Sequence, residues 1–206
     1  MSVWKITMTT ALLDQYRIQY LEYMTPIDNL PSIFQHGILS HNRAHRFNLV
    51  REDISDPNVQ NIRANKLVNG NQGPLHDYVN LYFNSRNPMM FRRKNVQDNI
   101  AILCVDRNYI GRRGVWYSDG NAASGATRFY YSRRRLYELN WNCIWADYWN
   151  DYEDGTRIRC AEVLIPGQVP SQDIQQVVVR TEHGLERARR IIPDNVPIIA
   201  HAGWFF

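Results

Sequence analysis

The chain has 206 residues, of which 44% are hydrophobic, 21% charged and 12% aromatic. These proportions are those of an ordinary globular protein, and the length suits a single domain over residues 1–206. No apolar run is long enough to cross a bilayer, so the composition excludes a membrane-spanning helix. The net charge of +4 fits a polyanionic partner but does not require one, because a solvated cationic surface needs no ligand.

The first twenty residues lack the long apolar centre of a secretory signal peptide. Four apolar or aromatic positions there predict a short helix: Leu12, Leu13, Tyr16 and Ile18. The three cysteines are isolated, odd in number and without the spacing of a metal site. They are Cys104, Cys143 and Cys160, and we expect reduced, buried thiols in a cytoplasmic protein.

A strand followed by a helix is predicted at residues 20–37. Tyr20–Thr25 is a strand candidate, Thr25 is a good N-cap, and Pro26 suits the first helical position. Gly37 closes the predicted helix. Helix N-terminal amides point outward, so this turn is a good place for a phosphate or a ribose. Pure scaffold explains the same pattern.

Residues 41–73 are polar and basic, and they show little periodicity. Val59, Ile62 and Leu67 indicate one short helix among them. Loops of this length within a domain are uncommon unless they are functional or disordered. A solvent-exposed loop that binds nothing is the alternative.

The stretch Leu75–Phe91 is the most informative part of the chain. Its centre, Tyr78–Phe83, is rich in aromatic and β-branched residues and predicts a strand. The exit, Asn84–Pro88, is turn chemistry with Arg86 inside it. An aromatic strand that delivers an arginine into a loop suits a flat ligand beside an anion, such as a nucleotide. A core strand followed by a surface turn is the alternative, and composition alone favours it.

The next segments alternate between buried strands and basic surface. Ile100–Val105 is a continuous apolar run and predicts a buried strand, and Val115–Ser118 predicts a strand that ends in a turn of small polar residues. Residues 127–135 interleave aromatics with arginines, a pattern that can hold a single nucleic-acid strand. An amphipathic helix with an exposed arginine face is the alternative. Leu136–Trp149 predicts an aromatic helix that belongs to the core.

Glu162 stands between Ala161 and Val163 in a predicted strand, Thr156–Ile165. A carboxylate flanked by apolar residues costs several kcal/mol when it is dry and unpaired, so it must face a partner, a ligand or water. A structural ion pair with one of the many arginines and a catalytic role both satisfy this requirement.

Residues 75–89 read Leu-His-Asp-Tyr-Val-x-x-Tyr-Phe-x-x-Arg-x-Pro-Met, which resembles the signature of DarT-type DNA ADP-ribosyltransferases. These enzymes are the toxins of DarT/DarG toxin–antitoxin pairs. Val59–Arg63 resembles the family segment that supplies an active-site arginine, Ser118–Ser124 is similar to the family pattern, and Ala161-Glu162 matches its strand glutamate. Tyr23 replaces the histidine of the family's Tyr-His-Ile-Thr motif. Tyrosine can stack and hydrogen-bond there, but it cannot carry a proton near neutral pH.

The resemblance implies an α+β fold with a split, mixed or largely antiparallel sheet and flanking helices. It implies NAD-dependent transfer of one ADP-ribose to a base in single-stranded DNA, with thymine as first choice and guanine as second. Glu162 is the residue expected to stabilise the oxocarbenium-like transition state, with Arg63 positioning donor and acceptor. The residues expected to hold NAD are Tyr23, Thr25, Asn29 and Tyr82, and those expected to face DNA are Arg86, Asn87, Met89, Arg157 and Arg159.

No metal is implied, and the expected partners are NAD, single-stranded DNA and a DarG-like macrodomain antitoxin acting on a monomer. Two alternatives stay open. The first keeps the enzyme and changes the acceptor to RNA or protein. The second is a non-catalytic single-strand-binding module that uses Tyr130–Arg135. Glu162 counts against the module, because a pure polyanion binder gains nothing from an inward carboxylate.

Overall fold

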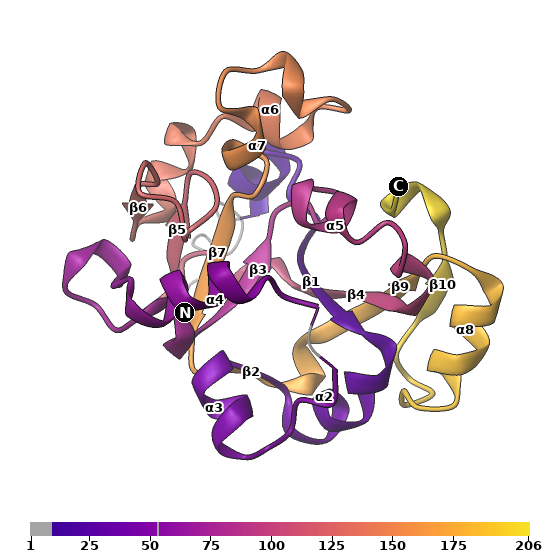
Figure 1. Cartoon of the computed structure of the whole chain (residues 1–206). Helices are drawn as coiled ribbons and strands as arrows, with labels where there is room; N and C mark the ends of the chain where they lie inside the picture. The colour runs from indigo at the N-terminus through magenta and orange to yellow at the C-terminus, as the bar shows by residue number, and fades with distance from the viewer. Residues whose placement is uncertain (1–9, 53) are drawn as a thin grey trace.

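The computed structural model describes residues 10–52 and 54–206 (Figure 1). Its strands are β1 (Tyr20–Pro26), β2 (Ile38–Leu39), β3 (Tyr78–Tyr82), β4 (Ile100–Asp106), β5 (Trp116–Ser118), β6 (Phe129–Tyr130), β7 (Glu162–Pro166), β8 (Gln168–Val169), β9 (Ile174–Val179) and β10 (Ile198–Ala200). Its α-helices are α2 (Leu30–His36), α3 (His41–Arg46), α4 (Pro57–Asn65), α5 (Pro88–Arg92), α6 (Trp141–Trp145), α7 (Gly155–Ile158) and α8 (Glu182–Arg189), and residues 10–15 are also helical. Within the described ranges, no helix is long and apolar enough to span a membrane.

The main sheet has the strand order β10-β9-β4-β1-β3-β7-β5-β6, and β2 pairs with β8 beside it. Strands β9 and β10 run parallel, while the other pairs recorded for the described residues are antiparallel. Helices lie at the sides of this sheet, with α8 beside β10 and α4 over β3 (Figure 1). The expected α+β architecture with a largely antiparallel sheet is confirmed.

The sheet is split between β1 and β3. β1 pairs with β4 along its whole length, from Tyr20↔Asp106 to Pro26↔Ile100. It pairs with β3 at one register position, Glu22↔Tyr82. The two strands diverge from there, and this divergence makes room for a cavity inside the sheet.

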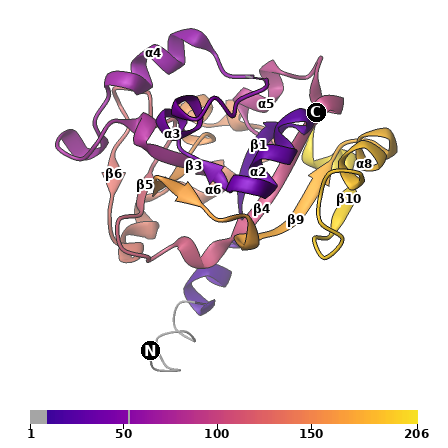
Figure 2. The same cartoon turned by 90° about the horizontal axis from the view of Figure 1, so that it is seen from below.

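Apolar side chains fill both faces of the sheet, because neighbouring strand residues point to opposite sides. Leu103 and Val105 belong to one cluster, which also contains Leu13 from the helical residues 10–15. Ile102 and Cys104 belong to the other, which contains Met90 of α5. The predicted burial of the Ile100–Val105 strand and of the three cysteines is therefore confirmed. Figure 2 shows α4 and the helical residues 10–15 on opposite sides of the sheet.

The helix predicted to begin after Thr25 starts later than expected. Pro26 has extended backbone angles, φ −55° and ψ 143°, and it ends β1 instead of opening a helix. Thr25 is a strand residue paired with Ala101 and caps nothing. A 3₁₀ turn, Ile27–Asn29, leads into α2, which Gly37 closes with a φ of 82°, as predicted.

The predictions for residues 136–161 were wrong in two places. The aromatic helix is broken into a 3₁₀ segment, Arg133–Glu138, and α6, because the Asn140 side chain accepts a hydrogen bond from the Cys143 amide and starts a new helix. The strand predicted from Thr156 begins only at Glu162, after the single-turn helix α7. Gly155 permits this turn, since a Cβ there would lie 1.8 Å from the Trp149 carbonyl oxygen.

Candidate functional site

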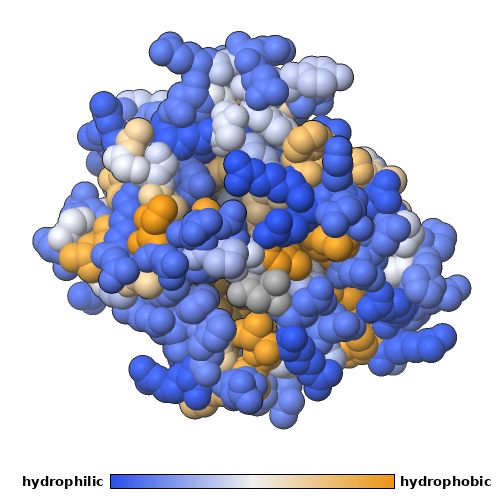
Figure 3. All heavy atoms as spheres, in the orientation of Figure 1, coloured by the Kyte–Doolittle hydropathy of each residue, from blue (hydrophilic) through white to orange (hydrophobic). Residues whose placement is uncertain are grey.

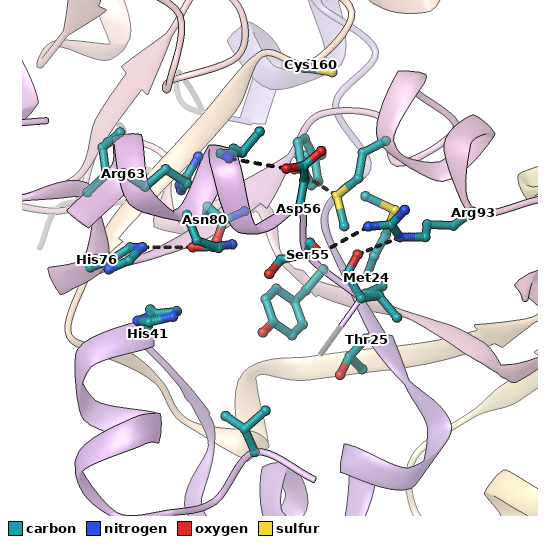
Figure 4. Close-up of a pocket in the computed structure, with 18 of the residues that line it drawn as sticks. Met24, Thr25, His41, Ser55, Asp56, Arg63, His76, Asn80, Arg93 and Cys160 are labelled. Atoms are coloured by element: carbon teal, nitrogen blue, oxygen red, sulfur yellow. Dashed lines mark hydrogen bonds between the residues drawn. The ribbon is translucent and has the colours of Figure 1, made fainter. Parts of the chain in front are cut away.

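A cavity of about 270 Å³ opens where β1 and β3 diverge. Its walls come from β1, β3, α3, α4 and α5, and Figure 4 shows Arg63 and His76 on one side of it with Met24 and Thr25 on the other. Ile54 and Ser55 also line the cavity, and Arg93 holds them in place by donating to their carbonyl oxygens at 2.6 and 3.1 Å.

All four residues predicted to hold a nucleotide line this cavity: Tyr23, Thr25, Asn29 and Tyr82. Asn29 is 8% exposed, accepts hydrogen bonds from the amides of Arg51 (3.0 Å) and Glu52 (3.1 Å) and donates to the Glu52 carbonyl (2.7 Å). It therefore holds the polar segment of residues 51–52 against the end of β1.

Asn80 also lines the cavity, and the sequence reasoning missed it. The signal was present, because residues two apart on a strand share a face. Tyr78, Asn80 and Tyr82 alternate along β3, and all three reach the cavity.

Glu162 and Arg63 form a buried, two-point ion pair. The Arg63 Nη1 lies 3.2 Å from Glu162 Oε1, and Nη2 lies 3.1 Å from Oε2. Glu162 is 1% exposed and Arg63 is 6% exposed. The ion pair left open by the sequence is thus present, and its arginine is the one predicted to share the site. Arg63 lines the cavity, and Glu162 stands behind it.

Further hydrogen bonds fix the Glu162 carboxylate and its backbone. Oε1 accepts a hydrogen bond from the Ala122 amide (2.8 Å), and the Glu162 amide donates to the Ser118 hydroxyl (3.0 Å). Both partners belong to the Ser118–Ser124 segment, which covers the carboxylate. Oε1 therefore has two donors, whereas Arg63 is the one donor recorded for Oε2 among the described residues.

The electrostatics of the site keep its groups in defined charge states. Burial lowers the pKa of Arg63, but the adjacent Glu162 carboxylate more than offsets this, so the pKa lies above its ordinary value and the guanidinium stays charged. Burial and the Glu162 charge raise the pKa of Tyr82 well above its ordinary value. Tyr82 is thus a neutral phenol, and its hydroxyl donates to the Met89 sulfur at 3.4 Å.

Three histidine rings pack together at the cavity wall, with His41 stacked on His76 and tilted against His45. The centroid of His41 lies 3.8 Å from that of His76 and 4.0 Å from that of His45. Burial, aided by His41 and Arg63, lowers the pKa of His76 to about 4, so its ring is neutral at pH 7. His76 Nε2 is 2.8 Å from Gln60 Oε1, one turn before Arg63 on α4. His76 is thus a hydrogen-bonded residue just before β3.

The residues predicted to face DNA are not brought together. Met89 lines the cavity, whereas Arg86 stacks 4.2 Å from the Phe206 ring and donates to the Phe205 carbonyl at 2.8 Å. Arg157 is occupied by Asp119 (2.7 Å) and by Asp154.

Two of those predictions need correction. Asn87 is fully buried and caps α5 by accepting hydrogen bonds from the Met89 and Met90 amides (3.0 and 3.2 Å). Arg159 is 2% exposed and donates to the backbone carbonyls of Arg86, Ile144 and Ala146. Neither side chain can reach a ligand on the surface, because its polar atoms are spent on the fold.

Glu22 stands at the junction between the two halves of the sheet, opposite Tyr82. It borders a second cavity of about 640 Å³ and accepts a hydrogen bond from the Ser85 amide at 2.6 Å. Burial raises its pKa to about 7, and the bonds from Ser85 offset only part of this effect. A second buried carboxylate on a strand beside Tyr82 was not predicted.

Comparison with protein families gives a match over most of the chain. The family model described as "DarT: ssDNA thymidine ADP-ribosyltransferase, DarT" matches residues 23–206. The DNA ADP-ribosyl transferase-DNA ADP-ribosyl glycohydrolase fusion protein of Thermosipho africanus is 31% identical over 197 residues. The alignment covers 92% of this chain, which spans half the length of that fusion. A DNA ADP-ribosyl transferase of Thermus sp. strain 2.9 is 26% identical over 181 residues, 82% of this chain and 85% of the relative.

Solved structures agree with the sequence match. The structure of Thermosipho africanus DarTG in complex with ADP-ribose superimposes with a TM-score of 0.82 and 28% identity, covering 91% of this chain and 51% of that one. Thermus sp. 2.9 DarT in complex with ADP-ribosylated ssDNA also gives a TM-score of 0.82, at 24% identity over 92% and 97% of the two chains. At that identity the second likeness supports the fold alone.

Proposed function

This chain belongs to the DarT family of ssDNA thymidine ADP-ribosyltransferases, and on that premise we propose that it transfers ADP-ribose from NAD to a thymine in single-stranded DNA. One observation carries the proposal at the level of residues. A strand carboxylate, Glu162, is buried against Arg63 at the wall of a cavity that the predicted nucleotide-binding residues line.

Glu162 is proposed to act on the donor. Breaking the bond between nicotinamide and ribose builds positive charge on the sugar, through an oxocarbenium-like state. A carboxylate that hydrogen-bonds the 2′-hydroxyl of that ribose strengthens its grip as the charge grows. Oε2 is the oxygen suited to this role, because Oε1 is already held by both Ala122 and Arg63. Arg63 must then yield part of its pairing when NAD binds.

Arg63 is proposed to orient the donor and the acceptor. Its guanidinium stays charged, faces the cavity and offers donors in a fixed plane that suits pyrophosphate oxygens or a base edge. Tyr23 and Tyr82 offer rings at the wall of the same cavity, where they can pack against the nicotinamide. Thr25 and Asn29 supply polar groups at the far end of β1.

The proposed acceptor follows from the family description, with guanine as the second choice. An unpaired base can enter a cavity without the unstacking that a duplex imposes. The fused relative carries a DNA ADP-ribosyl glycohydrolase in its name. We therefore propose a glycohydrolase of the DarG macrodomain type as the antitoxin partner of this chain, and a cytoplasmic site of action.

The test is labelled NAD with single-stranded oligonucleotides that contain or lack thymine, comparing the wild type with Glu162→Gln. Glutamine keeps an acceptor for Ala122 and Arg63, whereas alanine would leave the Arg63 charge buried without its partner. We expect label only on thymine-containing DNA and a loss of at least about a hundredfold in rate for Glu162→Gln. Glu186→Gln, an exposed glutamate of α8, is the matched control and should keep wild-type activity.

Other acceptors in the same assay decide the alternatives. Label on guanine-containing DNA that lacks thymine would move the proposal to its second choice. Label confined to RNA or protein would overturn the DNA assignment. Binding of DNA that is indifferent to both NAD and Glu162 would favour a non-catalytic module on Tyr130–Arg135.

A further inference from the structure

Three aromatic rings from distant parts of the chain meet at the surface beside α5. The centroid of Phe91 lies 5.2 Å from that of Phe206 and 6.1 Å from that of Trp149, and the last two are 5.7 Å apart. Each pair meets nearly at a right angle. Phe91 is 45% exposed. We call these three residues the ring cluster.

The backbone behind the ring cluster is fixed. The Phe206 amide donates to Gln97 Oε1 (2.8 Å), and Gln97 Nε2 donates to the Met90 carbonyl of α5 (3.0 Å). Gln97 is 1% exposed, so this link between Phe206 and α5 is shielded from water. The Trp149 carbonyl is packed against Gly155. Rings held in this way lose little conformational entropy when a ligand packs on them.

Cations stand over two of the rings. The Arg86 guanidinium lies 4.2 Å from the Phe206 centroid, and the Lys94 ammonium lies 5.2 Å from the Phe91 centroid. Residues 147–154, which carry Trp149, include four carboxylates: Asp147, Asp151, Glu153 and Asp154. The positive edge of the ring cluster is therefore its α5 side.

The ring cluster is continuous with the cavity through α5. Met89 and Arg92, one helical turn apart, line the cavity. Phe91 lies between them on α5 and contacts Trp149 in the ring cluster. In the space-filling view, hydrophobic side chains surface among hydrophilic ones between α5 and the end labelled C in Figure 1 (Figure 3). A strand with one base in the cavity thus meets these rings within a few nucleotides.

We propose that the ring cluster, with Arg86 and Lys94, binds the nucleotides of single-stranded DNA that flank the target base. The inference rests on the proposed function, because it takes the acceptor to be DNA. Aromatic rings stack on any base and cations neutralise the adjacent phosphates, so such a site holds a strand with little reading of its sequence. The Asn87 and Arg159 side chains predicted for this task are buried, and the rings supply the surface that they do not.

The test compares Phe91→Ala and Trp149→Ala with Phe47→Ala, a control phenylalanine that is 58% exposed and outside the cavity and the ring cluster. Transfer is measured with a four-nucleotide and a twelve-nucleotide oligomer of the same central sequence. We expect the ring-cluster variants to raise the KM for the longer oligomer about tenfold, with the KM for NAD and for the shorter oligomer within about twofold. Lys94→Ala should reduce the salt dependence of binding by about one counterion.

The proposal would be overturned if the KM for the twelve-nucleotide oligomer were the same in Phe91→Ala as in the wild type. Binding of the fluorescent twelve-nucleotide oligomer to Glu162→Gln, with and without Phe91→Ala, separates this failure from that of the proposed function. Weaker binding in the double variant while the wild type transfers nothing would support the ring cluster and overturn the transferase activity. Unchanged binding with intact transfer would do the reverse.

Discussion

The two sides of the cavity use their side chains in opposite ways. On the donor side, formed by β1, α4 and β7, the polar groups are buried and paired: Glu162 is 1% exposed, and Arg63 contacts it through two nitrogens. On the acceptor side, formed by α5 and the ring cluster, an apolar ring is open to solvent beside an exposed cation: Phe91 is 45% exposed, and Lys94 lies over its ring. A reacting ribose needs fixed charges, whereas a passing strand needs faces on which bases can stack.

Arginines separate the two sides further. Arg63 keeps its guanidinium at the cavity wall, but Arg159 turns inward and donates to three backbone carbonyls. Burial and the nearby Arg86 lower the pKa of Arg159 to about 10, and it remains charged at pH 7. The same residue type therefore faces the cavity on one side and holds the backbone of the scaffold on the other.

Arg159→Ala is the sharpest way to break this comparison, and its effect is expected to be the largest. Removal of the guanidinium takes the Arg159 donors from the carbonyls of Arg86, Ile144 and Ala146, and only Ile144 keeps another recorded donor, the Asn84 side chain, so the free energy of unfolding should fall by about 3 kcal/mol. Urea titration of the variant measures the loss, and Arg113→Ala, on the exposed surface, should change it by less than about 0.5 kcal/mol. Unchanged stability together with weakened DNA binding in Arg159→Ala would instead mean that Arg159 contacts DNA.

The positions of Glu162 and Tyr82 at the site could be predicted because both residues lie on strands with a recognisable pattern. Glu162 stands out in a run of apolar residues, and Tyr82 belongs to an aromatic strand in the most distinctive motif of the chain. Strand pairing then fixed their neighbours: Tyr82 is opposite Glu162 on one side and Glu22 on the other. A residue such as Asn80 was missed only because the alternation of β3 was not followed to its end.

The acceptor side resisted prediction because exposure and pairing depend on contacts far apart in the chain. Nothing in the local sequence shows that Arg157 meets Asp119, 38 residues away, or that Phe206 meets Phe91. The guanidinium groups of Arg86 and Arg157 instead donate to a carbonyl and to carboxylates of the fold. The boundaries predicted within residues 136–161 were wrong for a related reason. Gly155 and Asn140 set them through a close backbone contact and a side-chain hydrogen bond, which residue propensities do not include.

Glu22 sharpens the comparison at the point where the two sides join. Its pKa of about 7 in the folded protein lies above that of an unfolded glutamate, so folding favours the protonated form. The contribution of Glu22 to the free energy of unfolding is therefore fully present below about pH 4.5 and is lost as the pH rises through about 7. Raising the pH from 5 to 8 should lower the free energy of unfolding by about 2 kcal/mol through this group.

Glu22→Gln should remove that slope, and the comparison is made by urea unfolding of both proteins at the two pH values. The same substitution at Glu186 serves as the control and should leave the slope as it is in the wild type. Parallel pH profiles for the wild type and Glu22→Gln would mean that the carboxyl titrates normally, and that the junction is open to water.

Asn29 gives the smallest effect, and it tests how the donor side is built. Its oxygen accepts from the Arg51 and Glu52 amides, so Asn29→Ala frees a segment that borders the cavity. Loss of these bonds is worth about 1 kcal/mol, and we expect the KM for NAD to rise about fivefold with kcat within about twofold. Steady-state transfer at saturating oligonucleotide measures both.

Asn29→Asp separates anchoring from direct contact with NAD. Aspartate still accepts from both amides but loses the donor to the Glu52 carbonyl, and it places a negative charge beside a ligand that carries two phosphates. If Asn29 acts by holding residues 51–52, the aspartate variant should stay closer to the wild type than the alanine variant does. If its amide instead donates to NAD, aspartate should be the worse of the two, because it removes the donor and adds repulsion.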